Sequence, residues 1–322
     1  MKTSVSRRTT LAALAAGAFS PAWAQLGDYP NHPIELVVPY GAGGGTDVLA
    51  RAYAEAARKH MSQPMTVMNK PGASGAIGWQ EVVSAKPDGY KLTVMTVEIT
   101  TLPHMNMAKF TYEDFVPIAR LNADPAAITV KADAPWNTIE EFLAAAKKAN
   151  GDTRVGNSGN GSIWHLAAAA LEEKTGARFN HVPFNGANPA VLALLGGHIE
   201  AVAVSPAEVT AHVAGGKLKV LAVMADARAK GFEKVPTLKE RGIDLSIGTW
   251  RGLGAPKGTP PEIVALLKTV TAKAMNEAVL KDTMEKQNLG VSFADETQFR
   301  AAMAKDNLYF KQLMAKLNIK AS

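Results

Sequence analysis

Short apolar runs alternate along this chain with longer segments in which apolar residues recur every three or four positions. The run Ile34–Pro39 predicts a fully buried strand, and the segment Val48–His60 predicts a helix with Leu49, Ala52 and Ala56 on one face. Alternation of strands and helices along a whole chain is typical of α/β proteins with mostly parallel sheets. We therefore predict an α/β fold.

A second strand–loop–helix unit follows later in the chain. It consists of the strand Thr153–Gly156, the polar loop Asn157–Ser162 and the helix Ile163–Thr175. Other segments predicted as strands or helices are Met65–Met68, Ala76–Ala85, Lys91–Met95, His181–Phe184, Ala190–Leu195 and Lys219–Ala225. Two such units predict two similar α/β lobes.

Two further apolar strands, Val116–Asp124 and Leu245–Pro256, lie where the chain would pass between the lobes. We place the outward crossing near residues 122–124 and the return within residues 245–254. Lobe 1 then comprises residues 25–123 and 247–322, and lobe 2 comprises residues 124–246. The C-terminal segments Glu262–Ala278 and Glu296–Leu317 predict amphipathic helices packed on lobe 1.

Residues 1–24 have the features of a signal peptide. The pair Arg7-Arg8 precedes the apolar run Leu11–Phe19, and Ala22-Trp23-Ala24 is a small-x-small cleavage sequence. The apolar run is too short to span a bilayer. The arginine pair resembles a twin-arginine export signal, although Thr10 stands where that signal usually has Phe. We predict export to the periplasm and leave the export route open.

Charge and cysteine content argue against several classes of partner. The full chain has a formal charge of +6, and residues 1–24 contribute three positive charges, so the mature protein carries +3. This mild, scattered charge argues against nucleic acid as a partner and is compatible with small anions. The chain has no Cys and its seven His show no metal-ligand spacing. We predict no metal, no cofactor and a monomer.

The loop Tyr40–Asp47 is the most informative segment of the chain. It joins a buried strand to a helix, and Gly43-Gly44-Gly45 leave backbone N–H groups open to a ligand at the positive end of the helix dipole. The alternative is that Thr46 or Asp47 caps the helix while the glycines form a tight turn. A dinucleotide site is disfavoured, because Thr46 replaces the third glycine and no acid follows the second strand. We favour an anion-binding loop.

The second loop offers the same chemistry, with Ser158, Asn160, Gly161 and Ser162 as candidate contacts. It is not a nucleophile elbow, because Asn160 stands where the final glycine is required. His165, one turn into the next helix, would reach back to a ligand or serve as a triad base. The alternative is that His165 packs under the loop.

Arg251 lies on the return crossing beside Trp250, where a guanidinium can form a bidentate pair with a ligand carboxylate. The alternative is an exposed arginine paired with a neighbouring acid. Trp79, Trp136 and Trp164 are expected in the core rather than at the ligand.

The motifs taken together resemble one family. The pattern Val38-Pro39-Tyr40-x-x-Gly43-Gly44-x-x-Asp47-x-x-Ala50-Arg51 is similar to the first loop of Bug-type receptors, the periplasmic solute-binding proteins of tripartite tricarboxylate transporters. Other stretches that resemble this family are Asn69-Lys70-Pro71-Gly72-Ala73-x-Gly75-x-x-Gly78, Lys86-Pro87-Asp88-Gly89-Tyr90, Gly161-Ser162-x-x-His165-Leu166, Val182-Pro183-Phe184-x-Gly186, Leu194-Leu195-Gly196-Gly197-His198, Val235-Pro236-Thr237-Leu238-x-Glu240 and Ala255-Pro256-x-Gly258-Thr259-Pro260.

The resemblance implies a Venus-flytrap fold of the periplasmic-binding-protein type, in which two lobes joined by crossing strands close on a ligand carboxylate. It places one carboxylate contact on Gly43–Asp47 and the other on Ser158–Ser162 with His165. It also implies delivery of the ligand to membrane permease subunits. Further residues that the resemblance places along the cleft are Phe184, Asn185 and Ser205.

Glu98 departs from the family pattern, which usually has Ser or Thr at this position. A bare carboxylate facing a bound carboxylate would repel it, which argues against a plain dicarboxylate ligand. We expect Glu98 to contact a donor group of the ligand, such as an amine or a hydroxyl. The alternative is that it points to solvent.

Three functions compete on these observations. A transport receptor that captures a small organic carboxylate is favoured by the signal peptide and the two glycine loops. A ligand-sensing module would share the fold and differ only in its partner. A serine hydrolase needs a Ser–His pair, and Ser162–His165 is the only candidate, without an orienting acid. We expect a binding protein rather than an enzyme.

Overall fold

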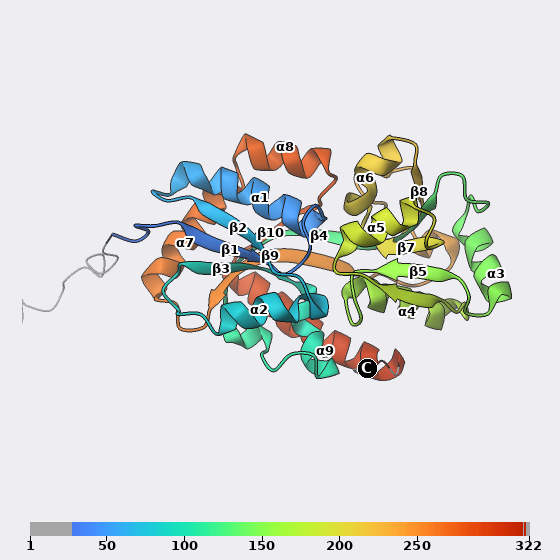
Figure 1. Ribbon diagram of the computed structural model, residues 1–322, viewed down its shortest axis with the longest axis horizontal. Helices are drawn as coiled ribbons and strands as arrows, with labels where there is room; N and C mark the ends of the chain where they lie inside the picture. The colour runs from blue at the N-terminus through green and yellow to red at the C-terminus, as the bar shows by residue number, and fades with distance from the viewer. Residues whose placement is uncertain (1–27, 318, 320–322) are drawn as a thin grey trace, which may run out of the picture.

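The computed structural model describes residues 28–317 and 319, which form two halves joined by long strands (Figure 1). The described strands form one ten-stranded sheet with the main order β2-β1-β3-β9-β4-β7-β5-β6, and helices pack along it. The predicted α/β class is confirmed. The predicted signal peptide and its twin-arginine pair lie outside the described residues.

The first half contains three parallel strands, β1 (Ile34–Val38), β2 (Met65–Asn69) and β3 (Lys91–Thr96). Side chains alternate between the two faces of a strand, and β1 follows this rule. Leu36 packs in a cluster with helices on one face, whereas Val37 packs in a second cluster on the other. The helices of this half are α1 (Gly45–Ala57), α2 (Ala76–Val83), α7 (Pro261–Ala274) and α8 (Ala278–Lys286).

The second half repeats the arrangement. Strands β5 (Arg154–Asn157), β6 (Asn180–Pro183) and β7 (Ala201–Val204) pair in parallel, and β8 (Leu218–Met224) pairs antiparallel with β4. Its helices are α3 (Ile139–Ala149), α4 (Ile163–Thr175), α5 (Ala187–Leu195) and α6 (Pro206–Ala214). Helix α4 has the bounds that the sequence predicts, whereas β7 and α6 were not predicted.

Strands β4 (Phe115–Lys131) and β9 (Gly248–Pro256) carry the chain from one half to the other. They run antiparallel, with Asp124 opposite Thr249, and β4 continues beyond this point to pair with β7 and β8. The short strand β10 (Val291–Ala294) pairs with the first part of β4. The expectation of mostly parallel sheets is therefore wrong, because every strand that joins the halves pairs antiparallel. The exact lobe boundaries stay a prediction.

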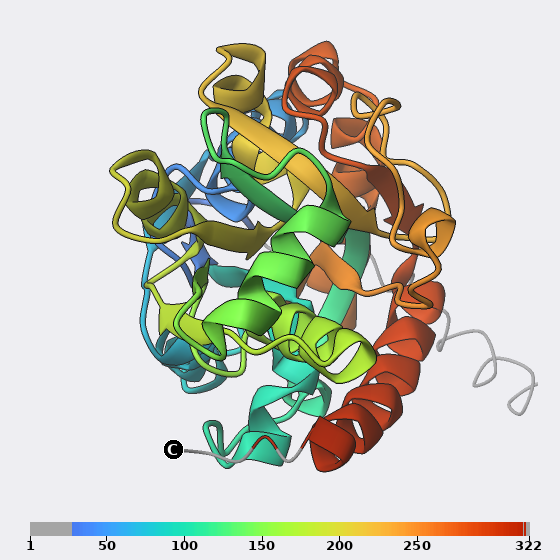
Figure 2. The same ribbon diagram turned by 90° about the vertical axis from the view of Figure 1, so that its right-hand side faces the viewer.

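The last helix, α9 (Glu296–Leu317), extends across both halves (Figures 1 and 2). Trp250 on β9 donates from Nε1 to Asp306 of α9 at 2.7 Å, and Lys316 near the end of α9 pairs with Glu173 of α4 at 2.9 Å. Helix α9 therefore packs on the first half, as predicted, and also contacts α4 of the second half.

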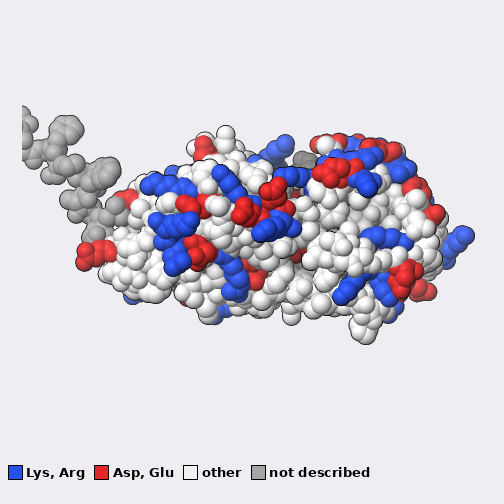
Figure 3. All heavy atoms as spheres, turned by 90° about the horizontal axis from the view of Figure 1, so that it is seen from above, with Lys and Arg blue, Asp and Glu red and all other residues white. Residues whose placement is uncertain are grey.

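The face seen in Figure 3 carries Lys and Arg interspersed with Asp and Glu over both halves, without a continuous basic surface. Within residues 28–317 and 319, none of the helices combines the length and the apolar character needed to span a bilayer.

The crossing strand β9 is packed too tightly for added side chains at Gly252. A Cβ there would overlap the Phe299 ring and lie 2.6 Å from the Ala119 carbonyl oxygen. Since backbone in a central strand cannot easily move, we expect Gly252→Ala to lower the free energy of unfolding by about 1–3 kcal/mol. Gly254→Ala on the same strand is the matched control, because its Cβ would mainly displace the flexible Met95 side chain. Equal urea midpoints for the two variants would contradict this account.

Candidate functional site

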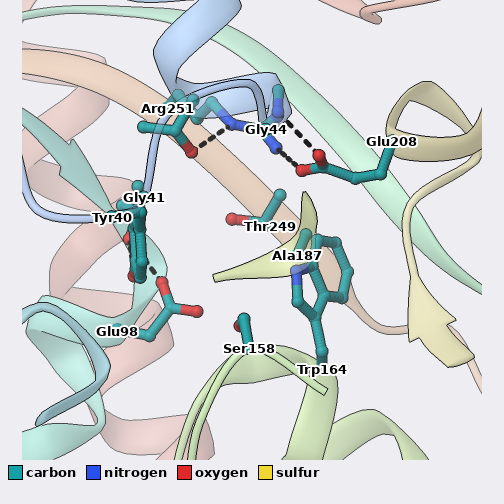
Figure 4. Close-up of a pocket in the computed structure, with 13 residues that line it drawn as sticks. Tyr40, Gly41, Gly44, Glu98, Ser158, Trp164, Ala187, Glu208, Thr249 and Arg251 are labelled. Carbon is teal, nitrogen blue, oxygen red and sulfur yellow. Dashed lines mark hydrogen bonds and ion pairs between the residues drawn. The ribbon is translucent and has the colours of Figure 1, made fainter. Parts of the chain in front are cut away.

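A small, partly open cavity lies where the first loop of one half faces the second loop of the other (Figure 4). It leaves about 20 Å³ of accessible volume, which is enough for little more than one water molecule. A bound organic molecule therefore requires the halves or the lining side chains to move apart. The lining residues are Tyr40, Gly41, Gly44, Gly45, Thr46, Thr96, Glu98, Ser158, Trp164, Ala187, Glu208, Thr249 and Arg251.

The first loop uses Asp47 to hold its own shape. The Asp47 carboxylate accepts hydrogen bonds from the Gly43 N–H at 2.9 Å, from Asn69 at 2.9 Å and from Arg51 at 3.0 Å. Burial alone would raise the pKa of Asp47, but these donors outweigh it and hold the pKa below its ordinary value. Asp47 and the N–H of Gly43 therefore stabilise the loop and do not face the cavity.

The N-terminus of α1 is occupied by a carboxylate of the protein itself. The Gly45 N–H donates to Glu208 Oε2 at 2.6 Å, and Glu208 belongs to α6 in the other half. A carboxylate at this position interacts favourably with the positive end of the helix dipole. Burial raises the pKa of Glu208, although Arg251 and the Gly45 N–H oppose that change.

Arg251 is buried with 1% of its surface exposed, and protein groups surround its guanidinium. Nη1 pairs with Asp124 at 2.5 Å and Nη2 with Glu208 at 3.0 Å, while Nε donates to the Thr46 hydroxyl at 2.9 Å. A buried guanidinium needs such partners, because an unpaired charge is costly to remove from water. The alternative is therefore wrong about the exposure of Arg251 and right that it pairs with acids of the chain.

Glu98 lies at the N-terminus of α4 in the second half. It sits in a 3-10 turn (Val97–Thr100) directly after β3 and is 2% exposed, so the alternative that it points to solvent is wrong. Oε1 accepts the Ile163 N–H at 3.0 Å, and the Thr96 hydroxyl donates to Oε2. The Tyr40 hydroxyl lies 3.0 Å from the Thr96 oxygen. Since the Thr96 proton goes to Glu98, Tyr40 is the donor in that contact.

His165 stabilises the second loop by hydrogen bonds with Gly161 and Ser162. Its Nδ1 accepts the Gly161 N–H at 3.0 Å, and its own backbone N–H donates to the Ser162 hydroxyl at 3.3 Å. Burial lowers the pKa of His165 to about 4, with a further contribution from His181. Because Nδ1 must stay unprotonated to accept, His165 is a neutral structural residue and forms no side-chain pair with Ser162 of the kind a hydrolase needs.

The structure brings seven of the predicted site residues to the cavity, namely Tyr40, Gly44, Gly45, Thr46, Glu98, Ser158 and Arg251. Those that lie away from its walls are Gly43, Asp47, Asn160, Gly161, Ser162, His165, Phe184, Asn185 and Ser205.

Backbone carbonyls of three of these outlying residues join the halves instead. Asn160 accepts from the Ser74 hydroxyl at 2.6 Å, Gly161 from the Thr101 hydroxyl at 3.2 Å, and Asn185 from the Gly41 N–H at 3.3 Å.

The six lining residues that sequence reasoning did not predict for the site are Gly41, Thr96, Trp164, Ala187, Glu208 and Thr249. Trp164 was expected in the core, and it packs in the core cluster as well as lining the cavity. The available signal for Glu208 was the apolar run Ala201–Val204 followed by Ser205 and Pro206, which marks a strand end and a helix start.

Comparison with known proteins identifies relatives over nearly the whole chain. The family model described as tripartite tricarboxylate transporter family receptor matches residues 49–319. A UPF0065 protein in the gbd 5' region of Cupriavidus necator is 35% identical over 93% of this chain and 91% of its own. Protein BugT of Bordetella pertussis is 30% identical over 86% of each chain.

Solved structures agree with these relatives. A TctC solute-binding protein from Polaromonas, without ligand, is 63% identical over 89% of this chain and 99% of its own, with a TM-score of 0.67. The periplasmic binding protein BugD is 30% identical over 91% of this chain and 100% of its own, with a TM-score of 0.86. MatC from Rhodopseudomonas palustris, with bound malate, is 24% identical over 88% of this chain and 99% of its own, with a TM-score of 0.83. The predicted periplasmic-binding-protein fold is confirmed.

The low pKa of His165 predicts a loss of stability in acid. The folded protein resists protonation of this ring down to about pH 4, whereas the unfolded chain takes up the proton near 6.5. The unfolded state therefore binds more protons between these values, and stability falls as the pH is lowered through this window, by up to about 1.4 kcal/mol per unit. His165→Asn keeps an acceptor for the Gly161 N–H and removes the titration. We expect the difference in melting temperature between this variant and wild type to shift in favour of the variant as the pH is lowered from 7 to 4.5. Exposed His198→Asn is the control, and parallel pH profiles for His165→Asn and wild type would contradict the prediction.

Proposed function

Because this chain belongs to the tripartite tricarboxylate transporter receptor family, we propose that it captures a small organic carboxylate in the periplasm and delivers it to membrane permease subunits. Receptors of this family are solute-binding proteins and not enzymes. The proposal includes export by the signal peptide at residues 1–24, with the export route left open, and action as a monomer.

One observation carries the proposal. The N-termini of α1 and α4, which come from different halves, lie at the same small cavity. The cavity is therefore lined by groups of both halves, and a ligand bound there would hold the halves together. Structures of the same fold with bound malate or adipate support a carboxylate as part of the ligand.

Opening and closing of the halves follows from the size of the cavity. A space of about 20 Å³ cannot admit an organic acid, so the ligand enters when the halves separate. The Polaromonas structure without ligand has a TM-score of 0.67 at 63% identity, lower than the 0.86 of BugD at 30% identity. Because closely similar sequences normally fold alike, this contrast supports a different arrangement of the halves. A hinge in β4 and β9 would allow it.

The first test is a thermal-shift screen of di- and tricarboxylates, hydroxy acids, amino acids and aromatic acids. A ligand that binds only the folded protein raises the melting temperature, by an amount set by its concentration relative to Kd. We expect at least one carboxylate to stabilise the protein and to reduce its radius of gyration in solution scattering. Stabilisation by another ligand class without any response to carboxylates would rule the proposal out.

The second test places a methyl group at the end of α1. A Cβ on Gly45 would lie 3.0 Å from both Arg251 Nη2 and Glu208 Oε1, whereas a Cβ on Gly44 would approach Glu208 Oε2 at an ordinary 3.4 Å. We expect Gly45→Ala to weaken the binding of the carboxylate found in the thermal-shift screen by about tenfold, the loss typical of a disturbed charged hydrogen bond. Gly44→Ala should weaken its binding less. Calorimetric titration of both proteins measures the difference, and equal affinities would remove the α1 terminus from the site.

A further inference from the structure

We propose that the ligand of this receptor carries a protonated nitrogen group in addition to a carboxylate, and that the two acids lining the cavity, Glu98 and Glu208, select for this group. The inference rests on the proposed receptor function and specifies the class of ligand as a small amino-carboxylate. The observations that carry it are the occupants of the two helix ends, the charge balance of the cavity and its aromatic walls.

Both helix ends at the cavity are occupied by carboxylates from the opposite half. Glu208 of α6 accepts the Gly45 N–H of α1 at 2.6 Å, and Glu98 after β3 accepts the Ile163 N–H of α4 at 3.0 Å. The protein thus already supplies the negative charge that these ends favour. A dicarboxylate would have to displace both side chains to reach the same donors.

The charges around the cavity sum to a negative value. Among its lining residues Arg251 is the only cation, and Glu98 and Glu208 are the acids. Arg251 is also shared with Asp124, which lies behind it at 2.5 Å. Two carboxylates, of Asp124 and Glu208, therefore pair with the one guanidinium, and Glu98 adds a third negative charge at the cavity without an ion pair to it. The side chains of Arg251, Asp124 and Glu208 are each less than 5% exposed. A second or third negative charge from the ligand would increase this imbalance in a region shielded from water, whereas a cation would reduce it.

The aromatic walls suit the same group. Tyr40 and Trp164 lie on opposite sides of the cavity, with the carboxylates of Glu98 and Glu208 near its two ends (Figure 4). Faces of Trp and Tyr attract cations, most strongly where water is excluded. The hydroxyls of Ser158 and Thr249 also line the cavity and can donate to the carboxylate end of the ligand.

The test uses probes of one chain length that differ only in their end groups: glutarate, 5-hydroxypentanoate, 5-aminopentanoate and 1,5-diaminopentane. Succinate, 4-aminobutyrate, aspartate and glutamate cover shorter and branched geometries. Affinities are measured by calorimetry with purified, ligand-stripped receptor at up to about 10 mM probe, which detects binding of millimolar strength. We expect an amino-carboxylate to bind at least about tenfold more tightly than the matched dicarboxylate, as for a charged hydrogen bond gained.

Three variants identify the groups responsible. Glu98→Gln and Glu208→Gln keep an acceptor for the helix N–H but lose the charge. Each should therefore weaken binding of the amino-carboxylate by about tenfold, while binding of the dicarboxylate stays unchanged or becomes tighter. Exposed Glu113→Gln is the control with the same charge change outside the cavity and should alter neither affinity.

Each result has a defined meaning. Equal or tighter binding of glutarate or 5-hydroxypentanoate would overturn the inference while leaving a carboxylate receptor intact. Binding of 1,5-diaminopentane alone would refute the proposed carboxylate function, while still supporting a site that binds a protonated nitrogen group. The absence of binding by every nitrogen-bearing probe, or equal losses for all probes in the Gln variants, would also overturn the inference.

Discussion

The antiparallel pairing of β4 with β9, and the buried Arg251 on it, determine how the two halves meet. Arg251 contacts Asp124 on the partner strand, Thr46 at the start of α1 and Glu208 on α6. One side chain therefore makes hydrogen bonds or ion pairs with the crossing strand β4, with the first half and with the second half. Because leaving any of these charges unpaired in the interior would cost several kcal/mol, the closed position of the halves and the position of the cavity depend on the same set of contacts.

Much of the fold could be predicted from local patterns. The apolar run of β1, the apolar face of α1 and the bounds of α4 and α9 follow from periodicity, since each element buries one face against its neighbours. The direction of pairing could not be predicted in this way. An apolar run looks the same in parallel and antiparallel sheets, so the antiparallel partners of β4 had no signal of their own.

The candidate site was predictable in position but not in detail. The glycines of both loops identified the two helix ends, and the departure at Glu98 identified a buried acid at the cavity. The roles of polar residues at the loops were harder to predict, because Asp47 and His165 accept hydrogen bonds from N–H groups of the loops and do not line the cavity. Glu208 was missed because an acid in the first turn of a helix is ordinary, and only the fold brings it to a helix end of the other half.

The reciprocal arrangement of Glu98 and Glu208 changes what a ligand must contribute. Where a helix end lacks an anion, a ligand carboxylate stabilises the closed form by supplying one. Here both ends have an anion before any ligand arrives, and each reaches across the interface between the halves. A ligand shifts the balance between open and closed forms only by the difference in its interactions with the two. The closed form has more carboxylates at the cavity than cations to pair with them. A cationic group on the ligand supplies the missing pairing.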